Sequence, residues 1–145
     1  MEYYFEIKLG FYNAWLGMVI LWLSGAGIMF FDKKTLKRLT DTSWYSKKDR
    51  FWLKLSQVLM YGVIIISLCI PLKIGTLWFY SGLVIWLAGI VGQFLALYNY
   101  ASTPLNQPVV GGMYKYSRNP IYFFYSLATF GVCVASASIP LIAAW

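Results

Sequence analysis

The sequence has 145 residues, of which 60% are hydrophobic and only 12% are charged, and its mean hydropathy is +0.63. This composition is typical of a membrane protein and argues against an ordinary water-soluble core. The chain has no histidine, which excludes a histidine-based catalytic triad or metal site, and its net charge of +7 does not indicate nucleic-acid binding because the basic residues cluster beside apolar segments.

Four uncharged segments predict membrane-spanning helices, each near the length of about 20 residues that a bilayer requires. They cover residues 11–31, 55–72, 77–97 and 120–135. A Ser-Ala-Ser turn then precedes the start of a fifth helix at residues 139–145. We therefore expect an all-α fold: one transmembrane domain over residues 1–145, a multi-pass helical bundle with about four full spans and the start of a fifth.

The segment 32–54 between the first two spans carries eight Lys and Arg residues against three Asp residues. This bias indicates a cytoplasmic loop, and an anionic-lipid-binding segment is the less favoured interpretation. The loop at residues 98–119 adds Lys115 and Arg118 and is expected on the same side. The N-terminus and the short connection at Lys73 would then lie outside.

Small residues predict close helix packing within the third span, where Ala88, Gly92 and Ala96 recur every four positions. Gln93 in the same span is expected to make a hydrogen bond inside the bundle. The two cysteines, Cys69 and Cys133, lie in apolar segments without metal-ligand spacing, which indicates buried and inert thiols.

The stretch GGMYKYSRNPIY at residues 111–122 combines glycines, aromatic residues, a permanent charge and a proline. Gly112 allows a backbone with positive φ, Pro120 suits the first turn of a helix, and Asn119 can cap that helix. The unpaired N–H groups of the helix start, together with Arg118, predict a binding site for a carboxylate.

Three tyrosines, Tyr114, Tyr116 and Tyr122, can form walls around a flat or cationic group. A ligand with a carboxylate, a cationic centre and a flat ring would satisfy the whole stretch. The alternative is a juxtamembrane anchor, because aromatic and basic residues are common at the membrane interface.

This stretch resembles the G-x-Y-x-x-x-R-[HN]-P-x-Y signature of small integral-membrane methyltransferases, the isoprenylcysteine carboxyl methyltransferase and phospholipid methyltransferase family. The matching positions are Gly112, Tyr114, Arg118, Asn119, Pro120 and Tyr122. The chain departs from the family where Asn119 replaces the commoner His and where Met113 replaces a frequent Pro.

The resemblance implies a binding site for S-adenosylmethionine, which carries a carboxylate, a sulfonium and an adenine. The residues that it assigns to the cofactor are Gly112, Tyr114, Tyr116, Arg118, Asn119, Pro120 and Tyr122. The family completes this site with an acidic segment after one more membrane helix, whereas this sequence has no acidic residue after Asp49. The resemblance therefore implies a C-terminally incomplete member that is not competent by itself.

The expected function is methyl transfer from S-adenosylmethionine to a lipid-like acceptor, such as an isoprenylcysteine carboxylate. The expected partners are membrane lipids and this lipophilic acceptor. The sequence nominates no catalytic base and no metal site. One alternative is a truncated, non-catalytic membrane protein that binds lipid or a partner. Another is an enzyme similar to steroid reductases that uses a nicotinamide cofactor, since those enzymes carry a similar Arg-[His/Asn]-Pro stretch.

Overall fold

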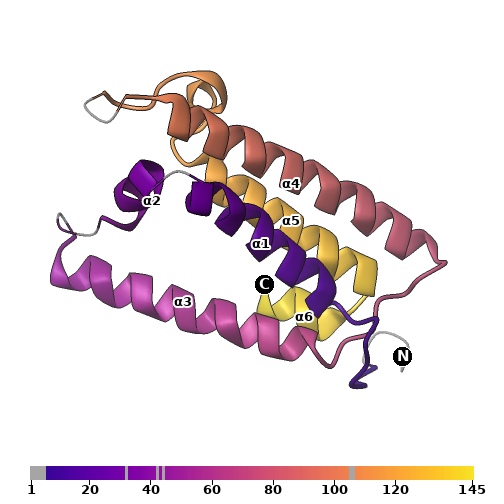
Figure 1. The fold of residues 1–145 in the computed structure, drawn as a ribbon. Helices are drawn as coiled ribbons and strands as arrows, with labels where there is room; N and C mark the ends of the chain where they lie inside the picture. Colours follow the sequence, from indigo (N-terminus) through magenta and orange to yellow (C-terminus); the bar gives the residue numbers. More distant parts are fainter. Residues whose placement is uncertain (1–5, 32, 42, 44, 105–106) are drawn as a thin grey trace.

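The computed structural model describes residues 6–31, 33–41, 43, 45–104 and 107–145, and the secondary-structure elements of this part of the chain are all helices (Figure 1). In this part of the chain the only β pairing is an isolated bridge between Asn13 and Pro71. The all-α expectation is therefore confirmed. In chain order the helices are α1 (Trp15–Phe31), α2 (Lys33–Thr40), α3 (Lys47–Ser67), α4 (Leu77–Ser102), the 3₁₀ helix η2 (Gly112–Lys115), α5 (Pro120–Ser136) and α6 (Ile139–Ala144).

The centre of the fold is the pair α4 and α5, which run side by side, and α1 packs against both (Figure 1). Their backbones approach closely because glycines stand at the contact: a Cβ atom on Gly89 would lie 2.5 Å from the backbone nitrogen of Ala128. Gly82 and Gly131 are likewise pressed against the partner helix. The predicted packing face is only partly right, since Gly92 and Ala96 are buried but Ala88 is exposed.

The first expected span, 11–31, is shorter as a helix because its initial residues are held by another segment. The side-chain amide of Asn13 donates to the carbonyl oxygens of Lys8 and Leu68, both at 2.6 Å. The backbone N–H of Ala14 donates to the oxygen of Ile70 at 2.8 Å. These bonds hold residues 11–14 in turns and an isolated bridge, so α1 begins only at Trp15.

The second expected span, 55–72, is displaced toward the N-terminus in the structure, where α3 runs from Lys47 to Ser67. Ser46 and Asp49 form a capping box: each side chain accepts a hydrogen bond from the other residue's backbone N–H. Part of the basic segment 32–54 is therefore helical rather than loop, and residues 32, 42 and 44 of it lie outside the described residues.

The third expected span, 77–97, and the loop expected at 98–119 also differ from the structure. Helix α4 continues to Ser102, and η2 adds a short helical turn at Gly112–Lys115. Beyond the loop, α5 occupies Pro120–Ser136 and ends at Ala137, whose φ of 48° is left-handed. Ser138 then caps α6 through a hydrogen bond from the N–H of Leu141 to its hydroxyl.

Two of the described helices, α3 and α4, are long and apolar enough to cross a membrane; α1 and α5 are apolar but shorter. The four full spans expected from the sequence thus reduce to two by this criterion. Helix α3 packs little against the rest of the chain, because only 6% of its most apolar window is buried. Its outward face presents the exposed apolar side chains Phe51, Trp52, Val58, Leu59, Tyr61, Ile65 and Ile66.

Candidate ligand-binding site

Gly112 and Pro120 have the backbone conformations that the motif predicts for them before and at the start of α5. Gly112 has a φ of 57°, and a Cβ atom there would clash with the side chain of Asn99. Pro120 is buried in the first turn of α5, where its missing N–H leaves no donor unpaired. Asn119 occupies the N-cap position, but its side chain makes no capping hydrogen bond, so the expected side-chain cap is absent.

A cavity of about 420 Å³ opens beside this helix start. Four of the seven residues predicted to bind the cofactor line it: Tyr114, Arg118, Asn119 and Tyr122. The other three do not. Gly112 supports the turn, while Tyr116, whose surface is 89% exposed, lies with Pro120 in a separate depression. The tyrosine walls predicted from the sequence are therefore Tyr114 and Tyr122 without Tyr116. We call the 420 Å³ space the motif cavity.

The opposite wall of the motif cavity comes from parts of the chain that the sequence did not assign to the cofactor site. Arg38 and Leu39 belong to α2, Asp41 and Tyr45 to the connection between α2 and α3, and Tyr100 to the last turns of α4. The charge bias of the segment 32–54 predicts a cytoplasmic loop, with anionic-lipid binding as the less favoured interpretation. That bias was the only sequence signal for it, and it did not distinguish Arg38 from its neighbours.

Arg38 is the residue that joins these elements. Its guanidinium lies over the ring of Tyr100, with Cζ 4.7 Å from the ring centroid. Nη1 donates to the carbonyl oxygen of Thr103 at 3.3 Å and Nη2 to that of Gln107 at 2.8 Å. The Tyr100 ring also lies 6.1 Å from the Tyr114 ring, so the basic segment, α4 and the motif meet at one place.

The motif cavity carries both signs of charge. Among the described residues that line it, Asp41 is the sole carboxylate, and Arg38 and Arg118 are the cations. Hydrogen bonds from Ser43, including its N–H at 2.9 Å, hold the pKa of Asp41 below its usual value, so Asp41 is anionic at neutral pH. Burial raises the pKa of Tyr114 to about 12, and its phenol therefore stays neutral.

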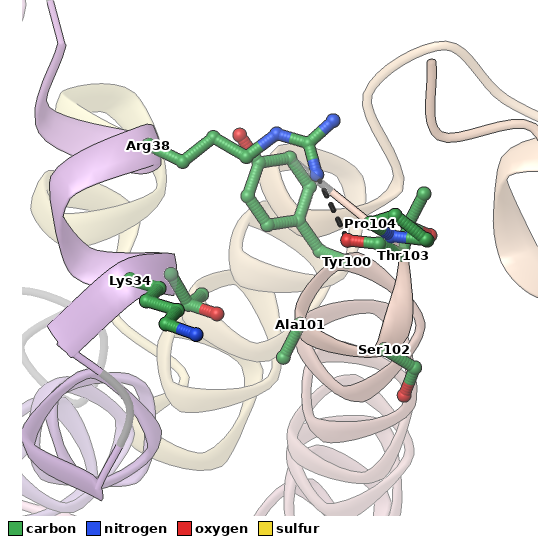
Figure 2. Close-up of a pocket in the computed structure, with 8 residues that line it drawn as sticks. Lys34, Arg38, Tyr100, Ala101, Ser102, Thr103 and Pro104 are labelled. Carbon is green, nitrogen blue, oxygen red and sulfur yellow. Dashed lines mark hydrogen bonds between the residues drawn. The ribbon is translucent and has the colours of Figure 1, made fainter. Parts of the chain in front are cut away.

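A second cavity of about 320 Å³ adjoins the first and shares Arg38 and Tyr100 with it. We call it the Arg38 cavity. Figure 2 shows how the side chains of α2 face the end of α4 across this space, with the hydrogen bond from Arg38 to Thr103 drawn as a dashed line. Its lining residues are Lys34, Thr35, Arg38, Tyr100, Ala101, Ser102, Thr103 and Pro104.

Other polar groups lie away from both cavities. Gln93, for which a hydrogen bond inside the bundle is expected, is buried, and its Oε1 has no hydrogen-bond partner among the described residues. Cys133 is buried and Cys69 is half-buried. Within the described residues no group of three His, Cys, Asp or Glu side chains is arranged to hold a metal ion.

The family described as "Protein of unknown function (DUF1295)" matches residues 18–145, which is most of the chain. No curated protein and no solved structure matches the chain.

Proposed function

The chain belongs to the DUF1295 family, and we propose that it is an integral-membrane methyltransferase that transfers a methyl group from S-adenosylmethionine to a lipid-like acceptor. The observation that carries the proposal is the composition of the motif cavity. Its volume of about 420 Å³ falls within the range of roughly 300–1,000 Å³ in which small-molecule sites occur. Its walls combine cationic, anionic and aromatic side chains.

Each part of the cofactor has a chemically suitable partner in this cavity. Arg118, exposed at the start of α5, can pair with a carboxylate through two parallel N–H···O bonds. Asp41 supplies a negative charge for a cationic centre. Tyr100 and Tyr114, whose rings are 6.1 Å apart, supply flat surfaces for a ring. The lining therefore offers a chemically suitable group for each of the carboxylate, the sulfonium and the adenine.

The protein's part in the reaction would be binding and orientation. S-adenosylmethionine, when bound, supplies a methyl group already activated on a sulfonium, which an acceptor nucleophile takes up as the carbon–sulfur bond breaks. Holding two reactants in line contributes much of a rate enhancement of this kind. Arg118 and Asp41 would fix the two charged groups, and the tyrosines would exclude water from one side. No side chain of the cavity is assigned as a general base.

Membrane placement in this proposal is supported by surface composition. The exposed faces of α3 and α4 carry large apolar side chains. Contact with lipid hydrocarbon would remove these side chains from water, which lowers the free energy. The basic segment and the motif meet through Arg38, whereas Lys73 pairs with Glu6 near the other end of α4. We therefore place the motif cavity and the segment 32–54 on the cytoplasmic side, with the N-terminus outside.

The acceptor in this proposal is lipophilic, such as an isoprenylcysteine carboxylate, and reaches the site from the bilayer. An apolar pocket of about 210 Å³ lies between α1, α4 and α5, but it is lined by Leu72, Gly82 and Trp86 and does not adjoin the motif cavity. We therefore do not assign it to the acceptor.

The test is cofactor binding by calorimetry in detergent, with Arg118→Gln compared with Lys115→Gln. Lys115 lies three residues away, is exposed and does not line the cavity, so this control removes an equal charge. Loss of a charge-assisted bidentate contact should weaken binding roughly ten- to a hundredfold in Arg118→Gln, with little change in the control. Equal affinities in both variants would contradict the assignment of Arg118.

A second experiment measures transfer of a radiolabelled methyl group from S-adenosylmethionine to lipid acceptors. It addresses the alternative of a non-catalytic membrane protein. Label in the lipid fraction would support a methyltransferase. It would also overturn the expectation that the chain is not competent by itself. Cofactor binding without transfer would agree with that expectation and with a non-catalytic membrane protein that retains the ligand site, whereas absence of cofactor binding would contradict the methyltransferase proposal.

A further inference from the structure

We propose that the Arg38 cavity binds a phosphate group, carried by the headgroup of an acidic lipid. The inference rests on the membrane placement proposed above but not on methyl transfer. It concerns the second of the two cavities, which the motif does not line.

The hydrogen-bond donors that face this cavity come from helix α2. Lys34 and Arg38 are four positions apart, so their side chains leave the same face of the helix (Figure 2). The hydroxyl groups on the opposite side are already used, because Ser102 donates to the carbonyl oxygen of Tyr98 at 2.7 Å and Thr103 to that of Asn99 at 2.9 Å. No carboxylate stands among the described residues that line the cavity. An anion is therefore the ligand that these walls favour.

Arg38 is held in place before any ligand arrives. The Tyr100 ring lies beneath the guanidinium, and two carbonyl oxygens fix Nη1 and Nη2. An arginine has five N–H donors, so further donors remain beyond these two bonds. A guanidinium with a fixed orientation loses less side-chain entropy on binding, which favours a phosphate with its several acceptor oxygens.

The contacts of Arg38 do not neutralise it. Thr103 lies at the C-terminal end of α4, and basic side chains commonly satisfy the last carbonyl groups of a helix. Carbonyl oxygens and an aromatic face carry only partial charge, however. Within the described residues the one ion pair joins Lys73 and Glu6, far from this cavity. A bound anion would supply the full negative charge that the guanidinium lacks.

The position of the cavity favours a lipid over a free phosphate ion. Tyr98 precedes Ser102 by one helical turn and is 61% exposed, and Leu95 and Phe94 continue the exposed apolar face of α4. Acyl chains could follow this face while the headgroup reaches Lys34 and Arg38. Because Arg38 also lines the motif cavity, an occupied headgroup site would fix one wall of the neighbouring site.

The experiment measures binding of phosphatidic acid to the full chain by native mass spectrometry in a neutral detergent at fixed ionic strength, with phosphatidylcholine as the reference lipid. Lys34→Ala and Arg38→Gln should each lower the apparent affinity for phosphatidic acid roughly tenfold. The matched control is Lys33→Ala, which removes the same charge from an adjacent exposed position that lines neither cavity. It should change the affinity less than about twofold.

Three results would overturn the proposal. Equal losses in Lys33→Ala and Lys34→Ala would show diffuse attraction to a basic surface rather than a site. Equal binding of both lipids by the parent chain would remove the phosphate specificity. Full competition by glycerol 3-phosphate at concentrations comparable to the lipid would assign the cavity to a soluble phosphate compound instead. Lys34 is exposed and makes none of the contacts by which Arg38 joins α2 to the end of α4, so Lys34→Ala tests the site separately from any loosening of α2 in Arg38→Gln.

Discussion

The guanidinium of Arg38 lies over the ring of Tyr100, with Cζ 4.7 Å from the ring centroid. This contact joins helix α2, which follows the first apolar helix, to the last turns of α4, which precede the motif. Both residues line the motif cavity and the Arg38 cavity. The pair is therefore the point at which the two halves of the candidate site are held together.

Replacement of Arg38 by Gln should loosen α2 without unfolding the bundle. The variant loses a cation–π contact worth roughly 0.5–2 kcal/mol and the hydrogen bonds to Thr103 and Gln107. Hydrogen exchange should become faster in Lys33–Thr40 and unchanged in α4 and α5. Lys37→Gln, on the same helix but outside both cavities, is the control. Unchanged exchange in Arg38→Gln would show that α2 is held by other contacts.

The contact between α4 and α5 should be sensitive to a single methyl group. In Gly89→Ala the new Cβ would lie 2.5 Å from the backbone nitrogen of Ala128, so the helices must separate. Overpacking of this kind typically costs about 1–3 kcal/mol. Gly62→Ala in α3 has no atom within 4 Å of the new methyl group and should be neutral or slightly stabilising. Thermal unfolding in detergent compares the two; equal melting temperatures would contradict the close approach.

The sequence predicted where the apolar helices lie in the chain better than it predicted their first and last residues. The apolar segments predicted α1, α3, α4 and α5, and the preference of proline for the first turn of a helix predicted that α5 begins at Pro120. The ends depended on polar contacts that periodicity does not report. Asn13 delays α1 by bonding to distant backbone, and the Ser46–Asp49 capping box starts α3 inside a stretch that charge alone marked as loop.

The candidate site was predicted only on the side that the motif forms. Local chemistry identified Arg118 and Tyr114, because a glycine turn, a proline and a helix start are readable from neighbouring residues. The opposite wall was missed because Arg38 and Asp41 reach the cavity through tertiary packing. Their segment had a sufficient explanation in membrane topology, and nothing in the sequence separated Arg38 from the lysines around it.

Tyr114 should remain protonated well into the alkaline range, because burial raises its pKa to about 12. The unfolded chain would ionise near pH 10. The folded state then binds more protons than the unfolded state between these values, so this contribution to stability is full below pH 10 and is lost as the pH rises toward 12. In NMR spectra of ¹³Cζ-tyrosine-labelled protein, Tyr114→Phe should remove a late-titrating resonance. A Tyr114 signal that titrates near pH 10 would contradict its burial.

The proposed topology predicts that the basic segment and the motif are labelled from the same side. Single cysteines at Lys37→Cys and Lys115→Cys, in a background with Cys69→Ala and Cys133→Ala, should react with a membrane-impermeant maleimide only when the cytoplasmic face is accessible. Lys8→Cys should react from the outside. Opposite accessibility of the first two positions would refute the topology and, with it, the membrane placement of the site.

Asp41 should discriminate between the charged and uncharged forms of the proposed cofactor. It is the carboxylate of the motif cavity, and its low pKa keeps it anionic at neutral pH. The variant Asp41→Asn removes the charge but retains an oxygen that can accept the hydrogen bond from Ser43. S-adenosylmethionine carries a sulfonium, whereas S-adenosylhomocysteine has a neutral thioether and the same carboxylate and adenine.

The measurement is the ratio of the two dissociation constants by calorimetry. In Asp41→Asn the affinity for S-adenosylmethionine should fall on the order of two- to fivefold relative to that for S-adenosylhomocysteine, since Asp41 is solvent-exposed and its attraction is screened. Glu6→Gln, which lies by Lys73 and lines neither the motif cavity nor the Arg38 cavity, should leave the ratio unchanged. If both ligands bind but the ratio is the same in Asp41→Asn, Asp41 does not face the cationic centre. If neither ligand binds the parent chain, the proposed cofactor itself is wrong, so the two failures are distinguishable.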